Sequence, residues 1–462
     1  MSARFVNLDR QTPMFLPCDL REWLPADHLV HFILDAVEQI PTGHFRVNHR
    51  GTGSEQYPPT MMLALLIYAY ATGRFGSRTI EAATHSDVAV RYLCANHHPD
   101  HDSICVFRTA NRAAFQAAFV TVLQLAQQLR LTRVGTVSVD GTKVQANASK
   151  HAAVSYQRAG ELITQLQLEV QELVTRAEQA DTREAKETLD LPAELTRRET
   201  RIDALQQARQ VIEARAKEMA TAQEAEHQAK VAARQAQRAA GKKPRGPEPR
   251  PPSEVPDPQA QYNFTDPESR IMKAGNGQHF EQAYNAQAAV NEVMLIVGQR
   301  VSAAPNDKQE LVASVAAISS VVAGDIHAVL VDSGFYSAAA VQAVEQKNDG
   351  TPSGLTVYAA VAKQSHHKTV ADLLPQPEPA SLPLDASPKE KMAHRLQTSV
   401  GQTLYKLRKP TVEPVFGIIK SVLGFRQFLL RGREKASLEW LLVCVSYNFK
   451  RLFTLKNLAP VG

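Results

Sequence analysis

A long stretch without strand-forming character divides this chain and limits the folds that it can adopt. From Ala153 to Ala240 the sequence is rich in Ala, Glu, Gln and Arg, and its apolar residues recur at heptad-like spacing. Asp190-Leu-Pro192 separates two such runs, which predicts a helical hairpin or coiled coil over residues 151–240. The Pro-rich residues 241–260 predict a flexible linker. Strands on either side must therefore pair across a helical insertion.

Apolar runs before and after the insertion predict an α/β sheet. Extended, strand-like patterns lie at 135–141, at 280–303 as two strands with a turn near Asn291-Glu292, at 327–331 and at 355–361. Helical spacing is found at 307–322, at 337–346 and in a last segment that carries Glu413. Residues 363–400 are expected to form a loop-rich interruption before that segment. This order of strands and helices indicates a mixed sheet of the ribonuclease H type.

Residues 16–130 predict consecutive short helices and hence an all-α domain over residues 1–130. The most apolar helix begins at Pro58 and ends near Gly73, and others begin near Ser77, Ser86 and Asp102. Short helices joined by tight turns resemble a helix-turn-helix arrangement, whose later helix can enter a major groove of DNA. A small helical bundle with no such role has the same pattern, so the sequence of these helices leaves both interpretations open.

Three acidic residues far apart in the chain lie at the ends of expected elements. Asp140 and Asp332 each close a β-branched apolar run, which places each at the C-terminal tip of a buried strand, and Glu413 begins the last helical segment. Any one of them can be a helix cap or a turn residue. Together they match the need of phosphodiester chemistry for two divalent metal ions held by carboxylates, with Asp140 bridging both ions.

The positive charge of the chain is concentrated near Glu413. The net charge is only +5, yet residues 401–456 carry eleven Lys or Arg against three Glu. A basic face beside a carboxylate cluster suits a polyanion such as DNA, although a solvated, charge-biased helix face has the same composition. Candidate DNA-binding side chains are those of Tyr405, Arg408, Lys409, Lys420 and Arg426.

The spacing around Glu413 predicts how these candidates are arranged. Lys420 follows Glu413 by seven residues, or two helical turns, so both are expected on the same side of one helix. Pro410 and Pro414 bracket the start of this helix. Because proline is tolerated in a first turn, the helix is expected to begin near Val412, with Tyr405 and Arg408 on the segment leading in.

Cysteine usage and hydropathy exclude other classes of protein. Four scattered cysteines do not form a disulfide framework. Cys94, His97, His98, His101 and Cys105 have near-zinc spacing, but Cys105 lies inside an apolar helical pattern, so buried thiols and loop histidines are expected. No apolar run approaches the roughly 18 to 20 residues of a membrane span, and the N-terminus lacks a signal-peptide pattern. A soluble, cytoplasmic protein is expected.

Longer motifs connect these residues to a known family. They are Asp140-Gly-Thr-Lys-Val-Gln-Ala-Asn-Ala-Ser-Lys-His, Tyr262-Asn-Phe-Thr-Asp-Pro-Glu-Ser-Arg-Ile-Met-Lys, Tyr284-Asn-Ala-Gln-Ala-Ala-Val, Pro305-Asn-Asp-Lys-Gln, Asp332-Ser-Gly-Phe-Tyr and the segment from Tyr405 to Lys420. Together they closely resemble DDE transposases of bacterial insertion sequences, in the broad group of families four and five. The resemblance runs nearly end to end.

The resemblance implies roles for individual residues. Asp140, Asp332 and Glu413 correspond to the catalytic, metal-binding triad, which implies dependence on Mg²⁺ or Mn²⁺, with two ions. Tyr405, Arg408 and Lys420 match the accompanying Tyr, Arg and Lys. Family members usually have three residues between the Arg and the Glu, whereas four separate Arg408 from Glu413 here. Either Arg408 is displaced or Lys409 takes its place.

The resemblance also implies an organisation and partners. Residues 131–150 and 261–462 would form the ribonuclease H-like catalytic domain, and residues 1–130 would recognise the terminal inverted repeats of the element. Target DNA and a second copy of the chain are implied partners, because both element ends are held together. The insertion can serve dimer contact, DNA contact or spacing, or be a solvated arm. A ribonuclease H-like nuclease without strand transfer, or a decayed or domesticated DNA-binding protein, are the alternatives.

Overall fold

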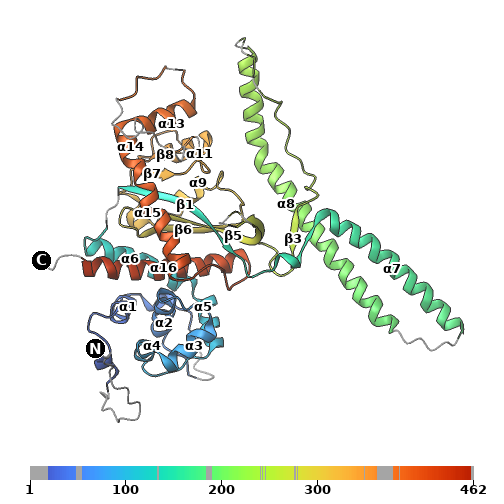
Figure 1. Ribbon diagram of the computed structural model, residues 1–462, viewed down its shortest axis with the longest axis horizontal. Helices are drawn as coiled ribbons and strands as arrows, with labels where there is room; N and C mark the ends of the chain where they lie inside the picture. The colour runs from blue at the N-terminus through green and yellow to red at the C-terminus, as the bar shows by residue number, and fades with distance from the viewer. Residues whose placement is uncertain are drawn as a thin grey trace, which may run out of the picture.

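The computed structural model of the chain has a central body and one projecting arm. It describes residues 19–47, 55–132, 135–183, 190–239, 241, 243–244, 246–274, 277, 279–347, 349–361, 378–383 and 385–458. Figure 1 shows the sheet near the middle of the body, with helices above and below it and a long helical hairpin pointing away.

Six strands form one mixed sheet in the body. They are β1 (Thr136–Gln145), β4 (Arg270–Lys273), β5 (Phe280–Asn291), β6 (Ile296–Ser302), β7 (Ala328–Val331) and β8 (Thr356–Ala359). The central strand β1 pairs antiparallel with β5 and parallel with β7. Beyond them, β5 pairs antiparallel with β4 and β6, and β7 pairs parallel with β8. The strands on either side of the insertion do pair, so the expected mixed α/β sheet is confirmed.

Two expected boundaries in this region are wrong. Strand β1 does not end at residue 141 but continues to Gln145, because residues 141–145 pair with β5. The helix expected at 307–322 is instead two short helices, α9 (Leu311–Ala316) and α10 (Ser320–Ala323). Between these helices the chain forms an antiparallel bridge to β6. The sequence of residues 307–322 has helical periodicity, but the helix is interrupted at Ile318, which pairs with Gly298 of β6. Helix α11 (Ala338–Glu345) follows β7 as expected.

The stretch expected to be loop-rich, residues 363–400, is partly helical. Helices α13 (Pro388–Gln397) and α14 (Ser399–Lys406) lie at its end, while residues 363–377 and 384 are outside the described part of the chain. Ser387 and Glu390 form a reciprocal capping box at the start of α13, a local signature that predicts a helix there. The chain continues through α15 (Arg408–Gly417), a π-helical turn η4 (Ile418–Val422) and α16 (Arg433–Leu458).

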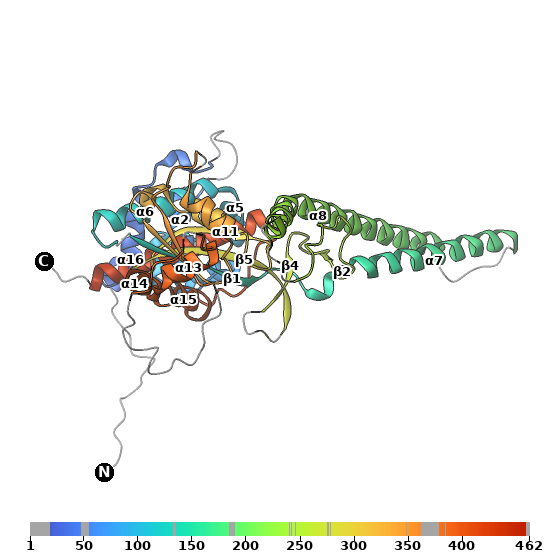
Figure 2. The ribbon, with the colours of Figure 1, turned by 90° about the horizontal axis from the view of Figure 1, so that it is seen from above.

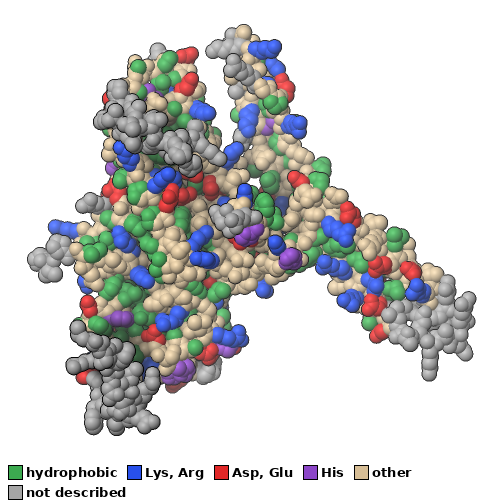
Figure 3. All heavy atoms as spheres, in the orientation of Figure 1, with side chains coloured by type: hydrophobic (Ala, Val, Ile, Leu, Met, Phe, Trp, Pro, Cys, Tyr) green, Lys and Arg blue, Asp and Glu red, His purple; other side chains and the backbone are tan. Residues whose placement is uncertain are grey.

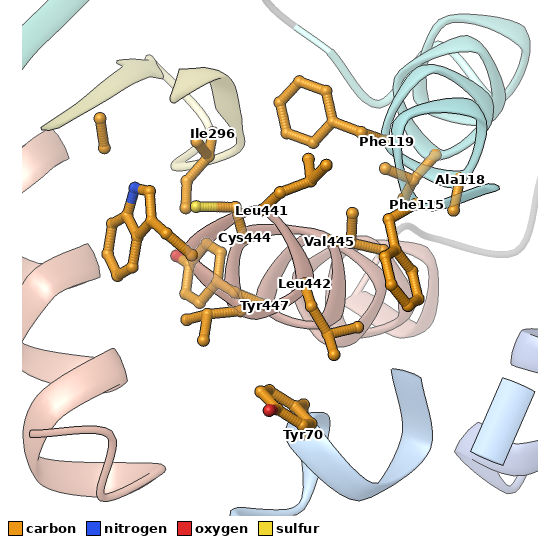
Figure 4. Packing of buried hydrophobic residues seen from close by; sticks show 14 of the residues in the cluster. Tyr70, Phe115, Ala118, Phe119, Ile296, Leu441, Leu442, Cys444, Val445 and Tyr447 are labelled. Carbon is orange, nitrogen blue, oxygen red and sulfur yellow. The ribbon is translucent and has the colours of Figure 1, made fainter. Parts of the chain in front are cut away.

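Every described regular element before β1 is helical. Two are short 3₁₀ turns, η1 (Leu20–Trp23) and η2 (Thr42–His44). The α-helices are α1 (Leu29–Glu38), α2 (Pro59–Ala71), α3 (Ser77–Ser86), α4 (Val88–Leu93), α5 (His101–Ala110) and α6 (Arg112–Gln128). Helices α2 and α6 pack directly on α16. Figure 4 shows Tyr70 of α2 and Phe115 and Phe119 of α6 turned toward Leu441, Leu442 and Val445 of α16. One buried cluster therefore runs from the N-terminal helices through α16 to the sheet.

The insertion forms the projecting arm. It begins with α7 (Tyr156–Arg183) and returns through α8 (Leu191–Ala239). The first part of α8 lies beside α7, and the rest of α8 continues past β3 and projects away from α7 (Figures 1 and 2). A two-stranded sheet, β2 (Ala153–Ser155) with β3 (Gln261–Asn263), closes its base. The arm has its own small buried cluster, which includes Ile163, Leu205 and Ile212. Its surface carries Lys, Arg, Asp and Glu interspersed along both helices (Figure 3).

The Pro-rich segment after the arm lies against α8 in its described part. Arg234 donates a 2.9 Å hydrogen bond to the carbonyl of Pro247, and Arg238 forms an ion pair with Glu248. Residues 242 and 245 of this segment are outside the described residues. None of the helices in the described ranges is both long and apolar enough to span a lipid bilayer.

Candidate functional site

Asp140 lies on the central strand at the point where one neighbour ends. The parallel pairing of β1 with β7 stops at Ser138 and Leu330, whereas the pairing with β5 continues past Asp140 opposite Ala288. The expectation of a strand tip was therefore wrong for β1 as a whole. The expectation holds only for the edge of β1 that faces β7, because β7 no longer pairs with β1 at Asp140. We call this the open edge of β1.

Asp332 follows β7 directly, as the sequence predicts. Its Oδ1 accepts a 2.8 Å hydrogen bond from the N–H of Gly334, which fixes the carboxylate at the end of the strand. Because β1 and β7 are parallel neighbours, Asp332 leaves the sheet beside the open edge of β1. The two aspartates, 192 positions apart in sequence, are close enough that the charge of Asp332 raises the pKa of Asp140.

Glu413 lies on α15, which begins earlier than expected. The helix starts at Arg408 rather than near Val412, so Pro410 occupies its first turn and Pro414 lies inside it. Proline at position 414 removes the N–H that would bond to the carbonyl of Pro410. The sequence argument required both prolines to avoid the helix interior, and this requirement was wrong. The Glu413 side chain is 52% exposed and accessible from solvent.

Arg408 joins two of the three acids. Its Nη1 lies 3.4 Å from Oδ2 of Asp140 and its Nη2 lies 3.3 Å from Oε1 of Glu413. The residue is only 9% exposed, whereas the neighbouring Lys409 is exposed. Of the two alternatives that the spacing left open, Arg408 is the basic residue that contacts the acids.

The electrostatics of Asp140 set it apart from an ordinary surface carboxyl. Burial raises the pKa of Asp140 to about 7, and the charges of Asp332 and Asp307 act in the same direction. The N–H of Gly141, which donates a 2.8 Å hydrogen bond to Oδ1, and the guanidinium of Arg408 lower this pKa. With this pKa the carboxyl is partly protonated at neutral pH, and a cation close to it would favour its ionised form.

Tyr405 approaches the site from α14. Its hydroxyl donates a 3.0 Å hydrogen bond to the carbonyl of Val331, the residue before Asp332. Burial raises the pKa of this half-buried phenol. Tyr405 lies on the segment leading into the Glu413 helix, as expected, and this segment is itself a helix, α14, with Thr398 as its N-cap. Through this bond, α14 supports the end of β7 that carries Asp332.

Lys420 and Arg426 lie farther along the chain, after α15. Lys420 is in the π-helical turn, and its Nζ donates a 2.5 Å hydrogen bond to the carbonyl of Lys143 on β1. Burial lowers the pKa of Lys420. Arg426 is exposed, and its Nε donates to the carbonyl of Lys420 at 3.0 Å. The expected two-turn spacing from Glu413 to Lys420 is altered, because a π turn changes the angular period of the helix.

The three acids approach one another without forming a closed ligand set. Among the described residues, no three or more His, Cys, Asp or Glu side chains gather closely enough to hold a metal ion. Arg408 lies between Asp140 and Glu413 and supplies the neutralising charge there. Figure 3 shows Asp and Glu side chains beside Lys and Arg in the part of the surface near α14 and α15.

The zinc-like cluster in the N-terminal helices has other contacts. Cys94 is fully buried, and burial raises the pKa of its thiol to about 12. His98 stacks on His85 with ring centroids 3.9 Å apart, and His101 contacts the carboxylate of Glu81 at 2.9 Å. Cys94 agrees with the expectation of buried thiols, whereas Cys105 is only partly buried and His101 begins α5 instead of lying in a loop.

A polar layer beside Asp140 was missed in the sequence argument. It comprises Lys143 on β1, Asn285 and Gln287 on β5, and Asp307 in the turn before α9. Polar residues at alternate positions of an otherwise apolar strand are a signal of a shared polar face. That signal was present at Asn285 and Gln287, but Asp307 could not be connected to them without the fold.

Two comparisons with protein families match opposite ends of the chain. Residues 18–110 match a family described as a transposase domain (DUF772), and residues 381–453 match a transposase DDE domain. The second match includes Glu413 and its neighbours, whereas Asp140, Asp332 and the helical arm lie outside both. No curated protein and no solved structure gave a significant match. Both family matches indicate a transposase and agree with the resemblance drawn from the sequence motifs.

Proposed function

Starting from the two transposase matches, we propose that this protein is a DDE transposase that binds the terminal inverted repeats of an insertion sequence, cleaves the DNA there and transfers the strand to a target. The observations that support the proposal are two pairwise arrangements: Asp332 lies beside Asp140 at the open edge of β1, and Arg408 contacts both Asp140 and Glu413. A raised pKa at Asp140 supports a functional rather than a structural role.

The arrangement of the sheet supports a ribonuclease H-like catalytic core. Strands β6, β5 and β1 form an antiparallel group, and β7 and β8 extend it in parallel with β1. In this proposal residues 131–150 and 261–462 form the catalytic domain, and residues 151–240 are an insertion in it. A parallel pair at the centre of such a sheet brings residues from the ends of two strands to one edge.

The donor set fits a hard divalent cation. Asp140, Asp332 and Glu413 offer only carboxylate oxygens, with no Cys or His among them, which matches the preference of Mg²⁺ or Mn²⁺. These three residues would hold the metal as two ions. Bound ions would supply Lewis-acid stabilisation of the scissile phosphate and a more acidic attacking water or hydroxyl. Arg408 would release the Asp140 and Glu413 carboxylates for this role and turn to a phosphate.

Basic and aromatic residues near the acids are proposed to hold DNA. Lys409 and Arg426 are exposed and can contact phosphates directly, and Lys420 supports the same face through its bond to β1. Arg408 contacts Asp140 and Glu413 from α15, and Tyr405 contacts the carbonyl of Val331, the residue before Asp332, from α14. The helices before β1 are proposed to recognise the inverted repeats, in a cytoplasmic homo-oligomer that holds both element ends.

The proposal is tested by cleavage of DNA that carries the inverted repeats flanking the coding sequence. The full chain with Mg²⁺ should nick the repeat ends and join them to a target, and Asp332→Ala should abolish both products. Asp325→Asn, a change to an exposed acid just before β7, is the matched control and should cleave normally. Undiminished cleavage by Asp332→Ala would refute the catalytic assignment, and cleavage without joined products would identify a nuclease.

Repeat recognition needs a separate measurement on the full chain, because the N-terminal helices share their core with α16. Footprinting should show protection of the repeats at salt concentrations that release arbitrary DNA of equal length. Equal protection of both DNAs would contradict specific recognition while leaving the cleavage result intact.

A further inference from the structure

Three arginines from distant segments lie near one another at the root of the helical arm. Arg215 is on α8, Arg270 is the first residue of β4, and Arg433 is the first residue of α16. Helix α8 passes β3 where the arm joins the body, and β3 contacts β4 (Figure 1). The charges of Arg215 and Arg433 both reach Arg270, because each lowers its pKa. We call these three residues the root arginines.

Two of the root arginines meet at a single backbone oxygen. Arg215 Nη2 donates a 2.5 Å hydrogen bond to the carbonyl of Pro267, and Arg270 Nη1 donates to the same oxygen at 3.2 Å. Arg270 Nη1 also donates to the carbonyls of Glu268 and Ser269, both at 2.9 Å. Two cations therefore lie side by side, with neutral carbonyl groups as their shared contacts.

The segment that supplies these carbonyls is held in place by buried side chains. Asn263 Oδ1 accepts hydrogen bonds from the N–H groups of Thr265 and Asp266, at 2.9 and 3.1 Å. The fully buried carboxylate of Asp266 accepts a 2.8 Å hydrogen bond from Tyr284 Oη and a 3.3 Å bond from the N–H of Gly432. Because Gly432 precedes Arg433, the same carboxylate fixes the start of α16. The fold thus determines where the root arginines lie.

No acid forms an ion pair with the root arginines. In the described part of the chain, none of the three has a carboxylate oxygen within 4.0 Å of its side-chain nitrogens. Glu268 is near enough to raise the pKa of Arg215, but its Oε2 accepts a 2.9 Å hydrogen bond from the backbone N–H of Arg433. Burial and the neighbouring guanidinium groups lower the pKa of Arg270 to about 10, so it stays charged at neutral pH at an electrostatic cost. A bound anion would remove this cost.

The root arginines also have donors that can reach such an anion. Arg270 Nε and Nη2 donate to no acceptor among the residues that the structure describes, and neither is a buried nitrogen without a partner. Arg433 is exposed, and its side chain makes no hydrogen bond or ion pair within the described ranges. Guanidinium groups with open N–H donors match the oxygens of a phosphate, which they can bind through two parallel hydrogen bonds.

Attachment of the arm to the body explains only one of the three residues. Arg215 joins α8 to the body through Pro267, and its guanidinium lies 5.8 Å from the ring centroid of Tyr262. Arg270 and Arg433 both belong to the body. Their charges repel Arg215 and weaken the attachment, so a role in holding the arm does not account for them.

Exposed basic residues connect the root arginines with the DNA-binding face proposed above. Arg426 and Arg431 lie in the segment between η4 and α16, and both are exposed. Arg426 Nε donates to the carbonyl of Lys420, and Arg431 Nε donates a 3.1 Å hydrogen bond to the carbonyl of Asn147, just after β1. Positive charge therefore continues from the candidate site to the root of the arm, as a DNA backbone requires.

We propose that Arg215, Arg270 and Arg433 bind a backbone phosphate of DNA at the root of the helical arm. The arm then supplies one of the ligands of this phosphate and is more than a spacer. This inference rests on the proposed function, because it assumes that DNA is the partner of the chain.

The test measures equilibrium binding of the full chain to a duplex that carries the inverted repeat, in EDTA, over a range of salt concentrations. Arg433→Gln removes an exposed charge without an intramolecular contact among the described residues, so it should weaken binding without changing thermal unfolding. Arg270→Gln combined with Arg433→Gln should lower the slope of log Kobs against log salt by about 0.9, the value for one phosphate. Arg176→Gln, on the exposed surface of α7, is the control and should bind like the native chain.

A variant with the opposite expected effect separates phosphate binding from a structural role. Glu268→Gln keeps an acceptor for the N–H of Arg433 but removes a negative charge beside the root arginines, so it should strengthen DNA binding, most at low salt. A purely structural cluster would change thermal unfolding and leave the affinity for DNA unchanged.

A second duplex of equal length without the repeat identifies which DNA is bound. An equal loss of affinity on both duplexes assigns the contact to any DNA, target DNA included, and a loss on the repeat alone assigns it to the element end. Native affinity of the double variant on both duplexes, or no gain in Glu268→Gln, overturns this inference alone. If the native chain binds neither duplex, the proposed function itself is overturned.

Discussion

Asp140 should make the metal-free protein less stable at alkaline pH. Its pKa is about 7 in the folded protein against a reference value of 3.8. Between these two values the folded state holds a proton that the unfolded state has released, so the free energy of unfolding falls as pH rises through this window. Asp140→Asn removes the charge with little change in shape. In EDTA at pH 8 the variant should be more stable than the native chain by roughly 1 to 4 kcal/mol, although it should not cleave DNA.

Urea unfolding of both proteins in EDTA at pH 5 and pH 8 checks this. The advantage of Asp140→Asn should be smaller at pH 5, where the native carboxyl is mostly protonated. An advantage of the same size at both pH values would show that the pKa of Asp140 is not raised by the fold. Saturating Mg²⁺ at pH 8 should stabilise the native chain and leave the variant unchanged, because a ligand stabilises only the form that binds it.

Arg408 and Lys409 are adjacent basic residues with opposite surroundings. Arg408→Ala removes the charge between Asp140 and Glu413, so the pKa of Asp140 should rise further and the acid limb of the cleavage profile should move to higher pH. Lys409→Ala changes an exposed side chain and should leave that limb in place. The measurement is the rate of DNA cleavage against pH for both variants. A shift caused equally by both would contradict the assignment of Arg408 to the site.

A buried hydroxyl pair is one of the contacts that hold α15 on β1. Thr411 Oγ1 lies 2.7 Å from Ser138 Oγ. Ser138 precedes Asp140 by two residues on β1, and Thr411 precedes Glu413 by two residues on α15. Thr411→Val should destabilise the fold by about 1 to 3 kcal/mol, because it leaves Ser138 buried without this partner. Ser138→Ala combined with Thr411→Val should be less destabilised than the sum of the single changes. Strict additivity in urea unfolding would show that the two hydroxyls are not coupled.

The elements that the sequence predicts correctly are those determined by local pattern. Alternation located β5 and β6, short apolar runs located β7 and β8, and heptad spacing located both arms of the hairpin. The start of α15 could not be obtained in this way, because tolerance of Pro414 inside a helix depends on packing around it. The π turn at Lys420 and the continuation of β1 to Gln145 also depend on partners distant in sequence.

The candidate site shows the same division. Asp332 and Glu413 were found because each lies at a recognisable position on a local element, and Asp140 because a strand pattern precedes it. Asp307 belongs to one of the motifs that carry the family resemblance, but its contacts with Asn285 and Gln287 of β5 could be known only from the fold. Arg408 was identified among the candidates, but its contact with two acids follows from the crossing of α15 over β1.

The joining of the N-terminal helices to the rest of the molecule was not predictable from local pattern either. Helix α2 is buried on nearly all sides, which indicates an internal helix but not its neighbours. In the structure it packs on α16, the last helix of the chain, and the two share one core with the sheet. The proposed repeat-binding helices and the proposed catalytic sheet are thus mechanically continuous through α16.

A buried polar network at this junction should hold the two ends of the chain together. Glu439 of α16 is fully buried and accepts hydrogen bonds from Tyr70 Oη and from the backbone N–H groups of Leu429 and Leu430, at 3.1, 2.9 and 3.1 Å. Arg108 of α5 lies 4.0 Å away and is also buried. Glu439→Ala would leave the Arg108 charge and three donors without this acceptor. It should therefore lower the free energy of unfolding by about 3 to 5 kcal/mol.

A double-mutant cycle separates the charge pair from the hydrogen bonds. Glu439→Gln keeps an acceptor and should cost less than Glu439→Ala, and Arg108→Met together with Glu439→Gln should be less destabilised than the sum of the two single changes. Denaturant unfolding followed by tryptophan fluorescence reports on the junction directly, because Trp440 is the buried neighbour of Glu439. If the double variant were as unstable as that sum, Arg108 and Glu439 would be energetically independent, and the charge pair would not contribute to the junction.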